Sequence, residues 1–266
     1  MEFLAYDFFR NALIGVILIS IASAVIGTYI VTRRLVSISG GITHACFGGL
    51  GLGYYLGWNP LLMAAVFAVG SSLGVQWMSS RHRVREDSAI AVVWAIGMAI
   101  GTLFIFLTPG YVPELNTFLF GNILTISRAD LWAFGIFTVV LLIFTRCFFH
   151  TIVICAFDSD FARVRQLPVT FISTAMTVLV AVCIVLTIRL VGVMLLMSML
   201  ALPQMIAESF ARRFKSIMLL SVAVSLVCCM AGLWMATVIE VPCSALIVLV
   251  MAVAYIITRI FAILRK

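Results

Sequence analysis

The chain has 266 residues, of which 64% are hydrophobic and 10% charged, and its formal net charge is +7. A water-soluble domain carries about a quarter of its residues as charged side chains, so this composition excludes an ordinary soluble protein and predicts one that lies in lipid. The positive charge would suggest a nucleic-acid partner in a soluble protein; in a membrane protein basic residues flank the helices on the cytoplasmic side, and we expect no nucleic acid.

The apolar runs predict an all-α integral membrane protein. A spanning helix uses about 20 apolar residues, and short polar loops separate runs of this length along the whole chain. We therefore expect a polytopic bundle of eight to nine transmembrane helices in a single transmembrane domain, residues 1–266. The count is eight if residues 187–190 lie within one long broken span. The expected spans are 11–32, 42–57, 60–80, 88–107, 130–149, 168–188, 191–210, 216–238 and 242–263.

The second expected span is rich in glycine. Seven glycines occur from Gly40 to Gly57, and Gly49, Gly53 and Gly57 form two pairs of small residues four positions apart. In lipid such glycines let the backbones of neighbouring helices approach closely, so we expect these three residues to serve helix packing.

His44 is an ionisable residue one turn inside the same span, on the face that also carries Gly40, Gly48 and Tyr55. Ionisable groups within a membrane usually line a substrate path or a wet cavity, and imidazole is the commonest side chain that binds metals. A single histidine is also used as a hydrogen-bonding packing residue, and both interpretations stay open. The sequence contains no HExxH and no histidine pair four residues apart, so it predicts no closed metal cage.

Residues 117–126 are apolar but too short to span, and they follow a loop rich in proline and glycine. We expect a short re-entrant or interfacial segment on the outer side. Non-helical backbone at that depth is tolerated only where protein or a wet cavity covers it.

The polar stretch from Phe157 to Arg165 is the best candidate for a short cytoplasmic helix. Asp158 can cap it, Asp160 falls in its first turn, and Arg163 falls in its last turn, just ahead of a proline that opens the next span. A stiff element of this kind could receive a push from a separate ATPase. An ordinary amphipathic surface turn has the same pattern.

Basic residues are distributed unevenly between the two sides of the membrane. All of the 17 lysines and arginines except Arg10, Arg128 and Arg189 fall on one side of the expected spans. The positive-inside rule makes that side cytoplasmic, and the C-terminus is expected there.

The chain carries no phosphate-binding loop. Neither of its two lysines, Lys215 and Lys266, follows a glycine, so the pattern G-x-x-x-x-G-K-[ST] cannot occur. Transport driven by ATP would need a separate subunit that hydrolyses it, and we expect the chain itself to be no enzyme.

Five segments, which together cover about residues 30–205, carry recognisable motifs in a fixed order. They are Arg33-Arg34 with Gly41-Ile42-Thr43-His44-Ala45, Arg85-Glu86-Asp87-Ser88-Ala89-Ile90, Leu119-Phe120-Gly121-Asn122-Ile123-Leu124 with Asp130-Leu131, Phe157-Asp158-Ser159-Asp160-Phe161-Ala162, and Val191-Gly192-Val193 through Leu202-Pro203. In this order they resemble the motifs R-R…S-H-A, R-E-D-x-A-I, L-F-G-N-I-L…D-L, F-D-P-E-F-A and V-G-V…I-P of membrane permease subunits of bacterial ABC importers for zinc, manganese and iron.

The resemblance implies a permease homodimer in the bacterial cytoplasmic (inner) membrane, a cytoplasmic ATP-binding subunit and an external or periplasmic metal-binding protein. A divalent metal ion would enter the cytoplasm by alternating access, with His44 on its pathway or at its gate. Asp158, Asp160, Phe161 and Arg163 would couple the chain to the ATPase. No cofactor is expected on this chain; its ligands would be the transported ion and membrane lipid.

The sequence departs from the family pattern at one informative position. The family's second helix often carries an Asp four residues before the histidine, and here that residue is Gly40. Zinc tolerates sparse nitrogen ligation better than manganese, which favours oxygen ligands, so the ligand chemistry favours zinc over manganese or iron. Glu114, Glu208 and Glu240 are the acids that could assist from other segments.

A self-contained, ion-coupled carrier of metal or small solutes is the alternative function. Such a carrier is expected to have buried acids within its spans and an inverted repeat, and the sequence indicates neither. An intramembrane enzyme is a third class, for which the chain lacks paired metal ligands and a serine–histidine couple. Co-purification with an ATPase would distinguish the importer from both.

Overall fold

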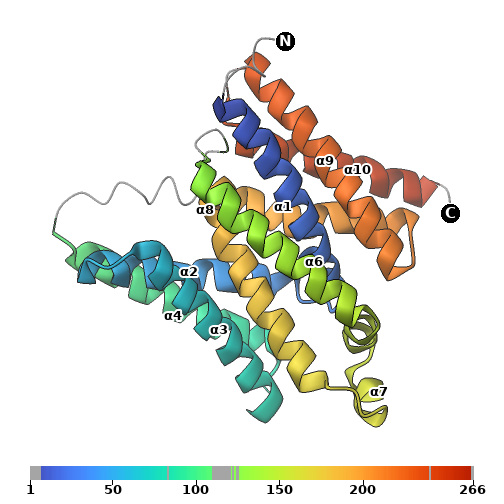
Figure 1. Cartoon of the computed structure of the whole chain (residues 1–266), viewed down its shortest axis with the longest axis horizontal. Coiled ribbons are helices and arrows are strands. Elements are labelled where there is room, and N and C mark those ends of the chain that lie inside the picture. Colours follow the sequence, from blue (N-terminus) through green and yellow to red (C-terminus); the bar gives the residue numbers. More distant parts are fainter. Residues whose placement is uncertain are drawn as a thin grey trace. The chain divides into compact units, whose positions relative to one another are not determined.

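The computed structural model describes residues 7–82, 84–109, 121, 123, 126–239 and 241–264, and its regular elements over these ranges are helices (Figure 1). The predicted all-α class is therefore confirmed. The elements are α1 (Asp7–Thr32), α2 (Val36–Leu56), α3 (Pro60–His82), α4 (Glu86–Leu107), α6 (Arg128–Phe157), α7 (Ser159–Val164), α8 (Val169–Phe210), α9 (Phe214–Ile239) and α10 (Cys243–Leu264).

Seven helices within the described ranges are long and apolar enough to cross a membrane: α1, α3, α4, α6, α8, α9 and α10. Helix α2 is not among them, because its six glycines, two tyrosines and one histidine lower its mean hydropathy. The expected eight to nine crossings thus remain a prediction. Of the expected re-entrant or interfacial segment 117–126, most residues lie outside the described part of the chain.

The spans expected at 168–188 and 191–210 both fall within α8, a 42-residue element in which two helices meet at a kink. The helix is interrupted at Gly192, whose φ of 79° and ψ of 172° are accessible almost only to glycine. Gly121 lies directly against this interruption, since a Cβ added there would be 2.2 Å from the Val191 carbonyl carbon.

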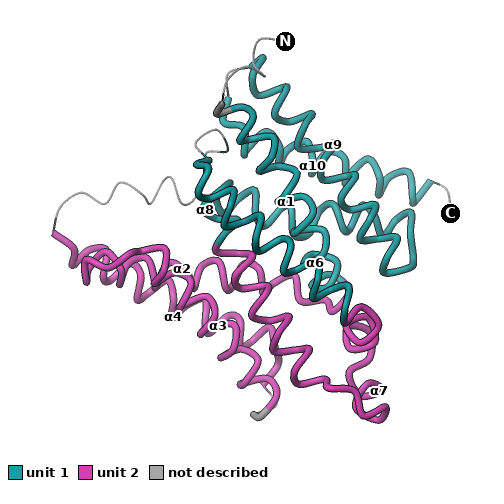
Figure 2. Tube along the Cα trace, in the orientation of Figure 1, with its two compact units in different colours: residues 1–31, 116–147, 186–266 teal, residues 32–115, 148–185 magenta. Residues whose placement is uncertain are grey.

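Contacts divide the chain into two compact units (Figure 2). Unit 1 contains residues 1–31, 116–147 and 186–266, and unit 2 contains residues 32–115 and 148–185. Helices α6 and α8 each run from one unit into the other, and the boundary in α6 falls at Phe148, where φ of −108° and ψ of 18° depart from helical geometry. The expectation of a single domain over the whole chain stays a prediction, and each unit is described by itself.

In unit 1 a proline within α8 is compensated by its neighbour. Because Pro203 has no N–H, the carbonyl of Met199, four residues earlier, loses its helical donor. The buried Gln204 side chain donates from Nε2 to this carbonyl at 3.2 Å and to the Ser23 carbonyl of α1 at 2.9 Å. Gly27 leaves room for the amide, since a Cβ there would lie 2.5 Å from Nε2. Gln204 therefore joins α8 to α1 at the position where the proline interrupts the helical ladder.

Replacing Gln204 by leucine is expected to lower the stability of the protein by about 1–3 kcal/mol, because two buried carbonyls lose this donor. The measurement is the melting temperature of the detergent-solubilised protein. Ser209→Ala is the control, since within the described residues the Ser209 hydroxyl donates its hydrogen bond to a carbonyl of its own helix, that of Met205, at 3.4 Å. Equal melting temperatures for the two variants would contradict a stabilising role for the Gln204 amide.

In unit 2, α2 packs closely on α4 through glycines on both helices. A Cβ added at Gly51 would lie 2.4 Å from the carbonyl oxygen of Gly101, and one at Gly48 would lie 3.0 Å from that of Gly97. Only residues without side chains permit this approach of two helix backbones. The glycines therefore set the distance between α2 and α4.

Two of the three glycines expected to serve packing face α3. A Cβ added at Gly49 would lie 2.4 Å from the Met63 carbonyl oxygen, and one at Gly53 would lie 2.8 Å from Cα of Pro60. Gly57 has a different place from the one expected. It follows the last residue of α2 with φ of 67°, and an added Cβ would meet nothing within 4 Å. Its left-handed backbone ends the helix, as glycine commonly does.

Candidate functional site

His44 lies in α2 with a half-buried side chain, and its ring stacks on the indole of Trp94 in α4. The ring centroids are 4.5 Å apart and the planes differ by 5°. The backbones of α2 and α4 are in close contact beside this pair. Gly97 lies about one turn beyond Trp94, and Ala45 is the neighbour of His44. A Cβ added at Gly97 would lie 2.4 Å from Cα of Ala45. The stack therefore follows from the glycine packing.

Sequence reasoning singled out His44 but missed Trp94. Tryptophans of membrane proteins gather at the two membrane–water interfaces, whereas Trp94 lies in the middle of the α4 span. That unusual depth is the one signal by which the sequence could have drawn attention to this residue.

Few other metal ligands accompany His44. Over the described residues no group of three or more His, Cys, Asp or Glu side chains could hold a metal ion. Gly40, the position of the missing acid, is buried in α2. Glu114 and Glu240 lie outside the described residues, and Glu208 belongs to unit 1 whereas His44 belongs to unit 2. One imidazole can hold a divalent ion only in company with ligands from elsewhere, because transition metals take four or more.

The first two resemblance segments meet in unit 2, at the start of α2 and of α4. The Ser37 hydroxyl donates to Asp87 Oδ1 at 2.9 Å, across 50 residues of sequence. The Arg33 guanidinium lies 3.8 Å from Glu86 Oε1. These polar contacts join the N-terminal ends of two helices that the glycines hold together further along.

Two other resemblance segments meet in unit 1 beside the interruption of α8. Arg189 donates from Nε to Asp130 Oδ1 at 2.5 Å, and the Ser127 hydroxyl donates to the other oxygen of the same carboxylate at 2.6 Å. Together with the contact of Gly121 on Val191, this ion pair connects the start of α6 and its preceding segment to α8. The resemblance residues Gly121 and Asp130 therefore serve to attach this part of the chain to α8.

The short helix α7 is where the sequence predicted it. Asp158 caps it, because its Oδ1 accepts hydrogen bonds from the backbone N–H groups of Asp160 at 3.0 Å and Phe161 at 2.9 Å. Arg163 lies 3.3 Å from Asp160, and Phe161 remains 47% exposed. The four residues of the expected coupling site therefore lie together on a short capped helix with charged and aromatic groups at its surface.

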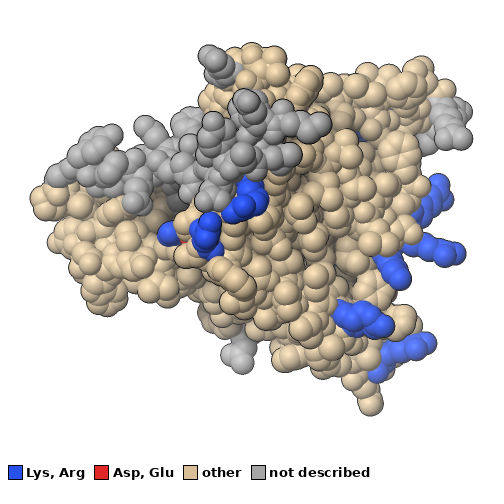
Figure 3. All heavy atoms as spheres, turned by 45° about the horizontal axis from the view of Figure 1, so that its top comes forward, with Lys and Arg blue, Asp and Glu red and all other residues tan. Residues whose placement is uncertain are grey.

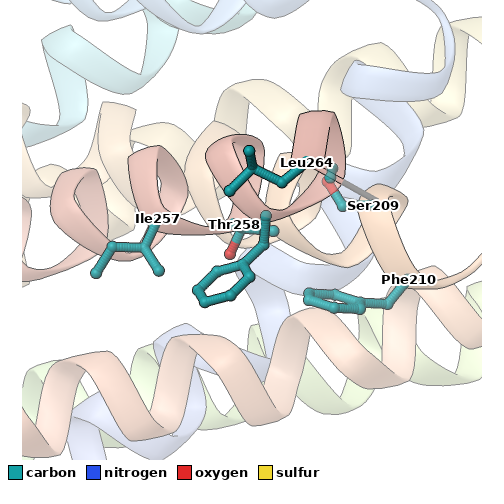
Figure 4. Close-up of a pocket in the computed structure, with 7 residues that line it drawn as sticks. Ser209, Phe210, Ile257, Thr258 and Leu264 are labelled. Carbon is teal, nitrogen blue, oxygen red and sulfur yellow. The ribbon is translucent and has the colours of Figure 1, made fainter. Parts of the chain in front are cut away.

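A cavity of about 650 Å³ lies apart from these residues, between α8 and α10 of unit 1 (Figure 4). Ile257 and Thr258 of α10 and Phe210 at the end of α8 face the same space. Its walls are mostly apolar and offer no metal ligands. The lining residues are Ser209, Phe210, Ile257, Thr258, Phe261, Ala262 and Leu264.

Charged residues occupy little of the face drawn in Figure 3. Lys and Arg side chains gather at its right-hand edge and near its middle, acidic side chains are hardly visible, and the rest of the described surface there is uncharged.

Known proteins resemble the chain over nearly its whole length. The model of the ABC 3 transport family matches residues 5–262. A probable metal transport system membrane protein of Chlamydia pneumoniae is 37% identical over 243 residues, which are 89% of this chain and 83% of that protein. The manganese transport system membrane protein MntC of Halalkalibacterium halodurans is 28% identical over 264 residues, with coverage of 98% and 89%. The solved structure of PsaBC from Streptococcus pneumoniae in complex with Fab is similar at a TM-score of 0.84 and 26% identity, covering 97% of this chain and 92% of that chain.

Proposed function

Because the chain belongs to the ABC 3 transport family, we propose that it is the permease of an ATP-driven importer that carries a divalent transition-metal ion into the cytoplasm. The observation that carries the proposal is His44, an imidazole within the α2–α4 helix pair that is neither fully buried nor fully exposed. Intramembrane ionisable groups mark ion pathways, and imidazole is a preferred ligand of transition metals. The names of the chlamydial and MntC relatives support a metal as the cargo.

Two copies of the chain form the pathway in this proposal. One chain offers a single imidazole, whereas two chains arranged around a common path offer two nitrogen ligands. Two ligands of one ion suit transport, because an ion that must be released cannot be held by a closed, fully protein-coordinated site. Alternating access would then expose the pair of His44 side chains first to an external metal-binding protein and afterwards to the cytoplasm.

A separate ATP-binding subunit supplies the energy. The chain has no phosphate-binding loop of its own. Helix α7 is the docking element, with Asp158, Asp160, Phe161 and Arg163 as the coupling residues, and it lies on the side that the count of basic residues makes cytoplasmic. The same count supports a cytoplasmic C-terminus in the bacterial inner membrane.

Manganese is the leading cargo and zinc the second. The MntC relative is named as a manganese transport protein, whereas the absence of an acid at Gly40 favours zinc by ligand chemistry. The decisive experiment is uptake of manganese into vesicles that contain the purified permease, its ATP-binding subunit and ATP, with zinc as competitor. Uptake without the ATP-binding subunit would overturn the importer and support the self-contained carrier.

Asp158→Ala is expected to reduce the stimulation of ATP hydrolysis in the assembled complex severalfold. Loss of an N-cap costs about 1 kcal/mol, which is roughly a fivefold change in the population of the docking-competent helix. Asp158→Asn is the matched control, because asparagine also caps helices, and it should keep most of the stimulation. Unchanged stimulation in Asp158→Ala would contradict the assignment of α7 as the docking element.

A further inference from the structure

We propose that Trp94 is a positioning residue of the metal pathway: its indole orients the His44 imidazole and stabilises the ion-bound form of that ring. The inference rests on the proposed pathway role of His44. It assigns a role to a residue of α4 that lies outside all five resemblance segments.

The geometry of the stack leaves the metal-binding edges of His44 unobstructed. Histidine binds a metal through a nitrogen lone pair that lies in the plane of the ring. Trp94 covers one face of the imidazole, with a 5° angle between the planes, and so restricts the rotation of the ring without occupying either nitrogen. An aromatic neighbour at 4.5 Å can thus fix the direction in which the lone pair points.

This contact replaces the usual means of orienting a metal-binding histidine. Such a residue commonly donates its second ring N–H to a carboxylate or a carbonyl group, which fixes its orientation. The position one turn before His44 is Gly40, which has no side chain. Within the described part of the chain the stack on Trp94 is the contact that holds the imidazole. The departure from the family pattern at Gly40 therefore makes the indole the orienting group.

The stack also favours the ion-bound ring over the free ring. A divalent cation withdraws electron density from the imidazole that binds it, and the face of an indole is the most electron-rich aromatic surface in proteins. The attraction between the two rings therefore increases when the ion binds. Because the indole stabilises the ion-bound imidazole more than the free imidazole, it raises the affinity of the site for the ion. If Trp94 only filled space, it would stabilise the ion-bound and the free imidazole equally and leave the affinity unchanged.

The pair lies beside a close contact of the two helix backbones. Gly97 lies almost one turn from Trp94 on α4, and a Cβ added there would lie 2.4 Å from Cα of Ala45, the neighbour of His44. Trp94 is nevertheless 42% exposed, so the stack lies at an accessible surface and not in a closed core. The described residues of the chain therefore do not enclose the stack completely, and the indole covers one face of the imidazole.

The test compares an aromatic and an aliphatic replacement in the complete permease–ATPase complex. Trp94→Leu is expected to raise the KM for manganese uptake about 3- to 30-fold with little change in maximal rate, because the aromatic support of the ion-bound ring is lost. Trp94→Phe, which keeps a stacking ring, should stay within about threefold of the parent. Trp234→Leu makes the same change at a 71% exposed tryptophan of α9 and should leave KM unchanged.

Three results would distinguish the possible failures. If Trp94→Leu and Trp234→Leu have the same KM for manganese uptake while His44→Ala abolishes uptake, the role of Trp94 is overturned and the pathway role of His44 stands. Equal losses in Trp94→Phe and Trp94→Leu would also overturn it, because the aromatic ring would then be irrelevant. Full uptake in His44→Ala would instead overturn the pathway on which the inference rests. If Trp94→Leu does not assemble, Trp94→Met, with a longer and more flexible apolar side chain, takes its place in the comparison.

Discussion

His44→Ala is expected to lower metal uptake by the reconstituted complex on the order of 100-fold or more, while the permease still assembles with its ATP-binding subunit. Loss of a group that merely supports a metal ligand already reduces affinity or activity 10–100-fold, and here the ligand itself is removed. No further cluster of metal-binding side chains exists within the described residues to replace it. The measurement is the initial rate of manganese and of zinc uptake into vesicles, with assembly checked by co-purification.

His150→Ala is the matched control for this experiment. His150 is the other histidine whose side chain is described, and it is exposed on α6 beside Phe149. Its replacement should leave uptake near the level of the parent protein. Normal uptake by a stably expressed His44→Ala protein would contradict the pathway role of His44.

Gly51→Leu is expected to prevent folding of unit 2 and to abolish recovery of assembled permease. Even the Cβ of an alanine at this position would lie 2.4 Å from the Gly101 carbonyl oxygen and 2.9 Å from its Cα. Helix α2 cannot move away, because Gly49 on its other side is equally close to the Met63 carbonyl of α3. Overpacking a well-packed interior costs about 1–3 kcal/mol for added methylenes, so Gly51→Ala should destabilise measurably and the larger Gly51→Leu should exceed that range.

Gly74→Ala in α3 is the control for the glycine prediction. An added Cβ at Gly74 would meet nothing within 4 Å, so alanine should fit without strain. Alanine also favours a helix over glycine by about 1 kcal/mol, and the melting temperature should stay equal or rise. If Gly51→Ala were as stable as Gly74→Ala, the close approach of α2 to α4 would not be needed for folding.

The apolar runs located most helices to within a few residues, because lipid imposes length and composition on each span. The errors have physical causes. The helix that contains the expected span 42–57 begins earlier, at Val36, because polar residues such as Ser37 and Ser39, which hydropathy leaves out, continue the helix before the apolar run. The Ser39 hydroxyl donates to the Val36 carbonyl at 2.7 Å. The break in α8 was expected within a few residues of its place, because Arg189 interrupts the apolar run between the spans 168–188 and 191–210; the backbone conformation of Gly192 itself is not visible in hydropathy. The family resemblance is confirmed by the match over residues 5–262.

The candidate site was only partly predictable from the sequence. His44 stands out by its chemistry, since an ionisable residue in an apolar span is rare. Trp94 does not, because its role depends on which face of α4 meets α2, and this depends on the glycines of both helices. Gly57 has the spacing of a packing glycine, but in the structure it follows the last residue of α2 and ends that helix with a left-handed backbone. The spacing of glycines does not reveal where a helix ends.

The pairing of Pro203 with Gln204 has a consequence for how this sequence can change over evolutionary time. As long as proline occupies position 203, the amide of Gln204 is the donor to the Met199 carbonyl. Any residue with a backbone N–H at position 203 would donate to the Met199 carbonyl in the usual helical way. Gln204 would then be needed as a donor only to the Ser23 carbonyl. The two positions are therefore epistatic: drift through folded intermediates is easier when the proline changes before the glutamine than in the reverse order.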